Sequence, residues 1–311
     1  ADGTTMTISG TGAMKEYYGS DNSPAYYNSK IKKVVIENGI TSIGAYAFSG
    51  CTNLASIEIP SSVTSVGDGA FQDCSSLTGI TIPESVTSIG DSAFFGCSGL
   101  TSITIPKNVT SIGDDAFYGT PWLTNKRQEN DSLVIVNGIL IDGTACSGKV
   151  TIPDGVTSIG NYAFMSCDGL TSITIPSSVT SIGVGVFDDC TALTEVLLEG
   201  GSTLTSESLG VDASKIRTYW NEDDLTWTLT ADGTLTISGT GAMKDYSYDS
   251  PACDNSNIKK VVIEEGVTSI GDSAFSDCRS LTDITIPGSV TSIGNGAFSG
   301  CSSLTDITIP S

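Results

Sequence analysis

Apolar residues recur in a fixed order along most of the chain. Residues 77–99, "LTGITIPESVTSIGDSAFFGCSG", show this order once. The first part has the spacing L-x-x-I-x-I, and the alternation of Ile80 and Ile82 predicts a short strand with one buried face. Pro83 predicts the end of that strand, because proline cannot donate a hydrogen bond to a β-ladder.

The second half of the same stretch predicts a return of the chain toward the core. Val86 and Ile89 point inward from a second extended piece, and a corner follows at Gly90. Asp91 is typical of the N-cap of a short helical turn, where a side-chain oxygen accepts a hydrogen bond from the following backbone amides. The apolar residues on the inner face of that turn are Ala93, Phe94 and Cys97.

The order repeats with a period of 23 residues. Cysteine stands at intervals of 23 at positions 51, 74 and 97, again at 167 and 190, and again at 278 and 301, and a phenylalanine precedes each by three residues. A unit of this size cannot bury its apolar side alone, so we expect the repeats to stack into one continuous core. Repeats begin at Ile31, Leu54, Leu77 and Leu100, resume near Ser147 and Leu170, become degenerate from Leu193, and restart at Ile258, Leu281 and Leu304.

The period, the L-x-x-I-x-I strand and the turn that follows resemble the leucine-rich repeat. The repeat pattern "LTxITIPxxVTSIGxxAFxxC" is similar to the repeats of the bacterial surface-antigen subclass known as BspA-like. The similarity extends over nearly the whole chain except the hairpin segments. The resemblance implies a curved solenoid with its strands side by side on the concave face. It also implies a secreted or cell-surface protein associated with adhesion and partner binding, on a scaffold not known for catalysis.

Other segments interrupt the repeats. "ADGTTMTISGTGAMKEY" at Ala1 is nearly duplicated at Ala231, where Asp-Gly between alternating segments predicts a hairpin, so the chain opens on what looks like the middle of a hairpin. "LVIVNGILIDG" predicts another hairpin, with its turn at Asn137 and Gly138, that protrudes from a junction between repeats. We interpret the duplicated hairpins as caps over the open apolar ends of repeat arrays.

These features together predict the fold class and the domains. We expect an α/β repeat protein, a strand-rich leucine-rich-repeat solenoid with short helical turns, β-hairpin caps and one inserted hairpin. The predicted parts are an N-terminal cap at 1–30, leucine-rich repeats at 31–220 with the inserted hairpin at 120–150, a second cap at 221–257, and a second, truncated array at 258–311.

The charge balance argues against nucleic-acid and membrane partners. With 14 Lys and Arg against 35 Asp and Glu, the chain has a net charge of −21, which repels phosphate backbones and anionic lipids. Solubility explains this acidity most simply, and cation binding is the alternative. Histidine is absent, which removes the usual general base and the commonest zinc ligand. We therefore predict no enzyme activity, no catalytic or metal site, no cofactor and no membrane insertion.

The cysteines and a column of acidic residues each allow two interpretations. Cysteines in successive coils would lie roughly 4.8 Å apart, close enough for disulfides, but we favour buried, reduced thiols because free cysteine is among the most buried residue types. Cys146 and Cys253 fall outside the column, in predicted loops. Asp or Asn recurs at the position of Asp91; capping of the turn explains this column, and calcium binding is the alternative.

Three groups of residues are candidates for contact with a partner. The first faces outward on the predicted sheet and comprises Ser102, Thr104, Lys149, Thr151, Ser172 and Thr174. The second lies in the insertion and comprises Trp122, Lys126 and Arg127. The third, Tyr17 and Tyr26, lies in the loop of the first cap, where the rings either contact protein or sugar or pack the cap onto the first repeat. Threonine ladders also simply favour strands, and the basic pair is equally consistent with solvated loop charge.

These observations favour a non-enzymatic extracellular or cell-surface protein that binds an extracellular protein or glycan and acts as a monomer. The competing hypothesis is a passive structural spacer within a larger surface protein, because the repeats are nearly identical and their polar face lacks the Trp, Tyr and Arg anchors of binding hot spots. A spacer predicts uniform repeats without a pocket. A binding module predicts a groove at residues 120–150 or at the tyrosine loops.

Overall fold

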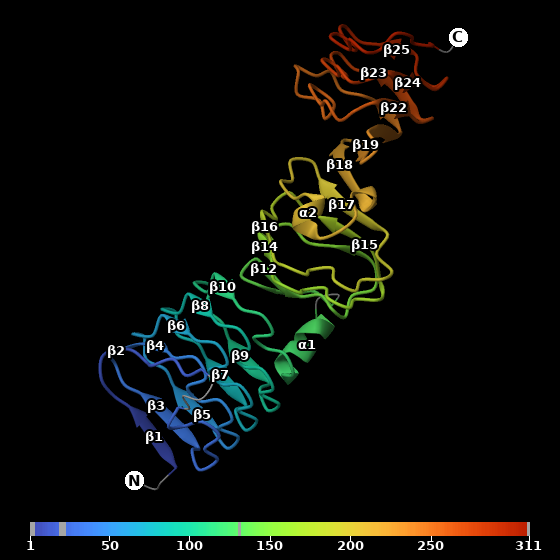
Figure 1. Ribbon diagram of the computed structural model, residues 1–311. Coiled ribbons are helices and arrows are strands. Elements are labelled where there is room, and N and C mark those ends of the chain that lie inside the picture. Colours follow the sequence, from blue (N-terminus) through green and yellow to red (C-terminus); the bar gives the residue numbers. More distant parts are fainter. Residues whose placement is uncertain (1–3, 19–22, 130–131, 310–311) are drawn as a thin grey trace. The chain divides into compact units, whose positions relative to one another are not determined.

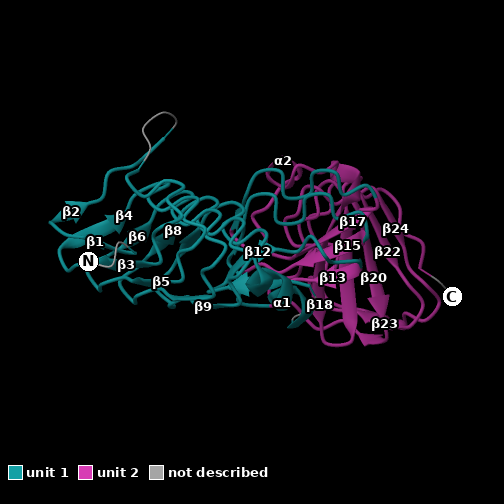
Figure 2. Ribbon diagram, turned by 90° about the horizontal axis from the view of Figure 1, so that it is seen from below, with its two compact units in different colours: residues 1–147, 154–169, 181–191 teal, residues 148–153, 170–180, 192–311 magenta. Residues whose placement is uncertain are grey.

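The computed structural model of the chain describes residues 4–18, 23–129 and 132–309. The chain divides into two compact units (Figure 2). Unit 1 comprises residues 1–147, 154–169 and 181–191, and unit 2 comprises residues 148–153, 170–180 and 192–311. As the repeat predicts, the fold is a solenoid of coils of about 23 residues that is rich in strands and poor in helix.

In the first part of unit 1, successive coils contribute strands to two rows (Figure 1). Neighbouring strands of a row pair in parallel at equivalent positions of successive repeats, as Ser65 does with Ser88, except that the first row consists of two sheets, β1-β3-β5 and β7-β9. The first row contains β1 (Thr5–Ile8), β3 (Lys33–Ile36), β5 (Ser56–Glu58), β7 (Gly79–Thr81) and β9 (Ser102–Thr104). The second row contains β2 (Gly12–Ala13), β4 (Ile40–Ile43), β6 (Ser65–Val66), β8 (Ser88–Ile89) and β10 (Ser111–Ile112).

The third side of each coil is a turn whose phenylalanine points into the core. The rings form a stack, with centroids 5.5 Å apart for Phe48 and Phe71, 5.3 Å for Phe71 and Phe94, and 5.7 Å for Phe94 and Phe117. All four side chains are buried. Because each ring packs against the rings of the neighbouring coils, the stack joins the coils into the continuous core that the period predicts.

No disulfide joins any of the nine cysteines, and seven of them are buried, as predicted for reduced thiols in the column. The Sγ of Cys97 donates to the backbone oxygen of Phe71, one coil earlier, at 3.0 Å. Burial raises the pKa of Cys97 to about 12, so this thiol stays protonated at neutral pH. The prediction that Cys146 lies outside the column is wrong, because Cys146 is buried and Cys167 donates to its backbone oxygen at 3.0 Å.

The aspartates at the corner of the repeat connect successive coils. The backbone N–H of Asp91 donates to Asp68 Oδ1 at 3.0 Å, and that of Asp114 donates to Asp91 Oδ1 at 2.9 Å. The prediction that these side chains cap their own turn is therefore wrong, since each carboxylate accepts its hydrogen bond from the coil that follows. The preceding glycine permits this approach, because a Cβ on Gly90 would lie 2.6 Å from the backbone nitrogen of Asp68.

Replacing Asp91 by alanine is expected to lower the free energy of unfolding by about 1 kcal/mol, because the Asp114 N–H loses its protein acceptor at an exposed position. Asp91→Asn keeps an acceptor oxygen and is expected to retain most of the stability. Urea denaturation followed by circular dichroism measures both variants. Equal losses in the two variants would contradict this role for the side-chain oxygen.

The segment that interrupts the repeats begins with a helix, α1 (Pro121–Glu129), which the sequence analysis did not predict. Thr120 caps this helix, since its Oγ1 accepts a hydrogen bond from the Leu123 N–H at 3.1 Å. Pro121 occupies the first helical position, where its missing N–H costs no intrahelical hydrogen bond. A Thr-Pro pair is a recognised helix-start signal, so the signal was present in the sequence.

The hairpin predicted in the same segment is confirmed. β11 (Val134–Val136) pairs antiparallel with β12 (Ile139–Asp142) around Asn137 and Gly138. The hairpin does not protrude as predicted, because β12 also pairs in parallel with β14 (Ser158–Ile159), which in turn pairs with β16 (Ser181–Ile182). The hairpin is thus a coil of the stack.

Unit 2 contains one sheet of eight strands in the order β13-β15-β17-β18-β19-β20-β22-β24. The second predicted hairpin is confirmed as the antiparallel pair β19 and β20. The preceding strand β18 was not predicted; it pairs with β17 on one side and with β19 on the other. The bounds are β13 (Gly148–Thr151), β15 (Leu170–Ile175), β17 (Glu195–Glu199), β18 (Ile216–Glu222), β19 (Leu225–Thr230), β20 (Thr234–Gly239), β22 (Lys260–Ile263) and β24 (Asp283–Thr285).

The remaining elements of unit 2 are short. A second sheet holds three strands in the order β21-β23-β25. Two helical turns follow β17, in the degenerate repeat. The bounds are β21 (Gly241–Ala242), β23 (Val267–Ile270), β25 (Ser292–Ile293), α2 (Ser206–Leu209) and the 3-10 turn Ala213–Lys215.

Candidate functional site

The turn of one coil in unit 1 is two residues shorter than the turn of the next coil. Leu140 pairs with Ile159 across adjacent strands, and Cys146 takes the column position next to Cys167. The chain advances six positions from Leu140 to Cys146 but eight from Ile159 to Cys167. Gly143 occupies the place that phenylalanine takes in the other turns, so this coil contributes no ring to the stack.

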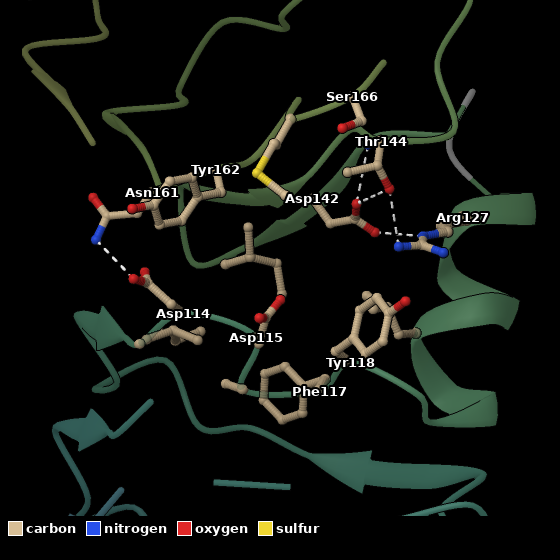
Figure 3. A pocket seen from close by; sticks show the side chains of 17 residues that line it. Asp114, Asp115, Phe117, Tyr118, Arg127, Asp142, Thr144, Asn161, Tyr162 and Ser166 are labelled. Atoms are coloured by element: carbon tan, nitrogen blue, oxygen red, sulfur yellow. Dashed lines mark hydrogen bonds and ion pairs between the residues drawn. The ribbon is translucent and has the colours of Figure 1, made fainter. Parts of the chain in front are cut away.

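The short turn leaves a pocket between the coils on either side of it (Figure 3). The pocket has a volume of about 570 Å³, and its lining residues all belong to unit 1. One wall is the turn before the short coil and the opposite wall is the turn after it, while α1 lies along one side. The lining side chains include Asp114, Asp115, Phe117, Tyr118, Arg127, Asp142, Thr144, Asn161, Tyr162 and Ser166.

The two facing turns present unused backbone hydrogen-bonding groups. In the turn of the preceding coil, three alternate N–H groups donate to carbonyl oxygens of the next coil at 2.7–2.9 Å. The equivalent N–H groups of Asp115, Phe117 and Gly119 have no acceptor among the described residues, because the turn that would accept them is shortened. On the opposite wall, the backbone oxygens of Asn161 and Met165 have no donor within the described part of the chain.

The charges at the pocket are predominantly negative. Arg127 Nε lies 2.5 Å from Asp142 Oδ2, so these two charges compensate each other. Asp114 Oδ2 accepts a hydrogen bond from the side-chain amide of Asn161 at 3.1 Å, which connects the two walls. The pKa of the Asp115 carboxyl is raised, first by partial burial and then by the neighbouring carboxylates, including Asp114 and Asp142.

Asp115 makes stability depend on pH. Because its pKa is raised in the folded state, its stabilising contribution is present below the ordinary value of 3.8 and is lost as the pH rises through the raised value. Asp115→Asn is therefore expected to unfold with a higher free energy than the parent at neutral pH. The gain is below about 1 kcal/mol, because solvent screens the exposed charge, and it shrinks as the pH falls toward 3.

Urea titrations of the parent and Asp115→Asn between pH 3 and pH 7 measure this difference. Asparagine also tolerates the positive φ of 51° at this residue, but that preference does not change with pH. A stability difference that stays constant across the range would contradict the electrostatic account.

Aromatic side chains frame the pocket. Tyr118 and Tyr162 are 52% and 43% exposed, respectively, and lie on opposite walls (Figure 3). Phe117 is buried, and the ring of Trp122 packs against it with centroids 4.7 Å apart. Trp122 was a candidate for partner contact, but it is 7% exposed and supports Phe117 from within the core.

The candidates on the strands do not line the pocket. Ser102 and Thr104 on β9 are exposed in unit 1, and Lys149 and Thr151 on β13 are exposed in unit 2. Their outward orientation agrees with the predicted alternation. Thr174 is half-buried.

Ser172 differs from the other strand candidates, because it lies on the same face as Lys149 and Glu195 but is not accessible to a partner. It is 6% exposed, and its hydroxyl donates to Glu195 Oε2 at 3.2 Å. Glu195 also forms an ion pair with Arg217 at 2.9 Å. The charged pair lies over the small hydroxyl and removes it from solvent.

The candidates on loops and on the insertion have separate surroundings. Arg127 lies on α1 and lines the pocket, whereas Lys126 forms an ion pair with Glu129 at 2.6 Å and does not line it. Tyr26 is exposed, and its ring meets that of Tyr27 edge-on at 4.7 Å. Tyr17 is half-buried, as expected for packing of the cap.

Sequence reasoning predicted a groove at residues 120–150 for a binding module, but it missed most of the residues that line the pocket. Asp115, Tyr118 and Tyr162 occupy ordinary repeat positions that carry no special motif. The available signal was the string "DGTAC", which ends at Cys146 and has neither the phenylalanine nor the full turn of a regular repeat. Such a string predicts a loop, whereas the structure shows a shortened coil.

The described residues of the site present backbone hydrogen-bonding groups, carboxylates and aromatic rings. Within residues 4–18, 23–129 and 132–309, no three His, Cys, Asp or Glu side chains come together in a way that could hold a metal ion. The longest helix in the described chain has nine residues, and none of the described helices meets the length and hydropathy required of a membrane span.

Three solved structures are similar to this chain. The leucine rich repeat protein of T. pallidum is 26% identical, covers 62% of this chain and 79% of its own, and has a TM-score of 0.38. A leucine-rich repeat protein from Eubacterium ventriosum is 25% identical over 99% of this chain and 93% of its own, with a TM-score of 0.40. A leucine rich cell surface protein from Faecalibacterium prausnitzii is 26% identical over 98% and 90%, with a TM-score of 0.34. No curated protein matches the sequence.

The repeats match a described family. The match is to the BspA type leucine rich repeat region, in six copies, over residues 22–138, 143–216 and 247–311. These ranges cover most of the chain and include the coils on both sides of the pocket. The chain therefore belongs to the family of BspA type leucine-rich repeat proteins.

Proposed function

We propose that the protein is a non-enzymatic binding module, displayed outside the cell, whose pocket holds an extended, positively charged segment of a partner polypeptide. The pocket of about 570 Å³ at the shortened turn carries this proposal. It lies where the repeat is interrupted, which is where a binding module and a passive spacer are expected to differ. The extracellular location rests on the resemblance to surface-antigen repeats, and antibody labelling of intact cells tests it.

The backbone groups of the pocket favour a polypeptide over a glycan. The free N–H groups of Asp115, Phe117 and Gly119 recur every second residue, which is the period with which an extended strand presents its carbonyl oxygens. The carbonyl oxygens of Asn161 and Met165 on the other wall accept N–H groups from the same segment. Addition of a strand to an open ladder is a common mode of peptide recognition.

The side chains of the pocket favour lysine or arginine on that segment. Asp115 and Asp114 supply negative charge, while Asp142 is already paired with Arg127. The exposed rings of Tyr118 and Tyr162 offer faces on which a cation can lie. The net charge of −21 attracts cationic partners at a distance.

Fluorescence polarisation tests the proposal with short labelled β-strand peptides that are identical except for Lys or Glu at alternate positions. We expect the Lys peptide to bind and the Glu peptide not to bind. Methylation of alternate amide nitrogens of the Lys peptide is expected to abolish binding, because the wall carbonyls lose their donors.

Variants of the protein locate the binding. Asp115→Asn is expected to weaken binding of the Lys peptide by about 1 kcal/mol, which raises its Kd roughly fivefold. Asp154→Asn, at an exposed residue of unit 1 outside the pocket, is the control for loss of one charge. The proposal is wrong if no peptide binds, if Lys and Glu peptides bind equally, or if the two variants weaken binding to the same extent.

A further inference from the structure

The chain contains two copies of the same cap, and they differ in one element. Met6 and Ile8 of β1 pair with β3 at the same positions at which Leu235 and Ile237 of β20 pair with β22. In the second copy a further strand, β19, pairs antiparallel with β20. In the first copy β1 is the outermost strand of its sheet among the described residues.

The additional strand of the second copy carries a buried tryptophan. Trp227 is 0% exposed and is the antiparallel partner of Ile237. Its ring lies 5.6 Å from the ring of Phe275 and 6.0 Å from that of Tyr246. The indole therefore fills the space between the cap and the first turn of the array, where its apolar area is removed from water.

The first copy has a cavity where the second copy has the indole. This cavity has a volume of about 290 Å³. It is lined by the counterparts of the residues that surround Trp227, because Tyr17 and Phe48 correspond to Tyr246 and Phe275 in the duplicated sequences. Its lining includes Met6, Ile8, Met14, Tyr17 and Phe48.

We propose that this cavity is the binding site for a tryptophan on a β-strand that pairs antiparallel with β1, and that polypeptide joined directly to Ala1 supplies this strand. The filled counterpart indicates what kind of strand the cavity binds. That strand alternates apolar and hydroxylated residues, as Leu225–Thr230 does, and places the indole on its inward side. The open edge of β1 supplies the backbone partner. In the second copy the strand that carries the tryptophan, Leu225–Thr230, directly precedes Ala231, which is the counterpart of Ala1.

The experiment uses the full chain extended at its first residue by Leu-Thr-Trp-Thr-Leu-Thr, the sequence of β19. An otherwise identical extension with alanine in place of tryptophan is the control. The difference in fluorescence between the two proteins isolates the added indole from Trp122, Trp220 and Trp227. Acrylamide quenching and the thermal midpoint are measured on both.

We expect the added indole to be quenched several times more slowly than in the free peptide, and the tryptophan extension to melt at least about 2 °C above the alanine extension. Tyr17→Ala, which removes one wall of the cavity, is expected to reduce both effects. An indole that is quenched as rapidly as in the free peptide, or equal midpoints for the two extensions, would overturn the proposal. The outcome does not depend on peptide binding at the pocket beside the shortened turn, so the two proposals fail separately.

Discussion

Replacing Phe71 by alanine is expected to lower the free energy of unfolding by about 3–5 kcal/mol, the range for truncation of a buried phenylalanine. Phe71 is 0% exposed and stacks on Phe48 and Phe94, so its removal leaves a void in contact with two coils. Repeat proteins depend on contacts between neighbouring coils. The loss is therefore expected to lower the cooperativity of unfolding as well as its free energy. Urea denaturation followed by circular dichroism measures both.

Phe298→Ala is the matched control for this prediction. Phe298 is half-buried, and the structure shows its ring stacked on that of Phe275, at 5.4 Å. Truncation there removes less buried area and is expected to cost roughly 1–2 kcal/mol. If the two variants lost equal stability, position in the stack would not determine the contribution of a ring.

Gly271→Ala is expected to destabilise unit 2 by about 3 kcal/mol, which is at the upper end of the usual cost of overpacking. A Cβ at Gly271 would lie 1.8 Å from the backbone oxygen of Lys244 and 2.7 Å from its carbonyl carbon. Backbone cannot rotate away as a flexible side chain can, so the cap has to separate from the first coil. Thermal denaturation of the variant measures the cost.

Gly288→Ala provides the comparison for this prediction, because a Cβ there would meet no atom within 4 Å and the residue lies in the same unit. It is expected to leave the thermal midpoint nearly unchanged. A large loss at Gly288, or none at Gly271, would show that the close approach of the backbones does not limit the choice of residue.

The strands and the core were predictable because the same local pattern of apolar residues recurs in every repeat. Alternation at Ile80 and Ile82 predicted a strand, and β7 is found there. The period then requires equivalent residues to pair, as Ile80 does with Ile103. Burial of one face of each coil follows from the apolar spacing alone, so no long-range information was needed.

The partners of polar side chains were not predictable by the same reasoning. Capping rules look for a partner within the same turn, whereas the acceptor oxygen of Asp91 bonds the residue 23 positions later. Ser172 occupies an outward position but is covered by Glu195, which Arg217 holds in place. These charges lie on strands that the repeat pattern describes poorly.

The pocket shows a different limit of sequence reasoning. The interruption at residues 120–150 was predicted to be the place for a groove in a binding module, and Arg127, Asp142 and Thr144 of that segment line the pocket. However, the pocket results from a turn that is too short rather than from the inserted hairpin. The residues missing from a shortened turn leave no pattern in the sequence to interpret. The effect of the shorter turn depends on which neighbouring turns face each other across it.

The column of buried cysteines allows the local unfolding of individual coils to be measured. The buried thiols of Cys51, Cys74, Cys97, Cys190 and Cys278 have raised pKa values and donate to the coil before them, as Cys97 does to Phe71. An alkylating reagent therefore reacts with such a thiol only after that coil separates. Mass spectrometry of native protein after timed alkylation would then rank the coils by the frequency with which they open. The half-buried Cys301 would react early and the fully buried Cys74 late. The alkylation rate of each cysteine would thus report the opening of its coil without any added probe.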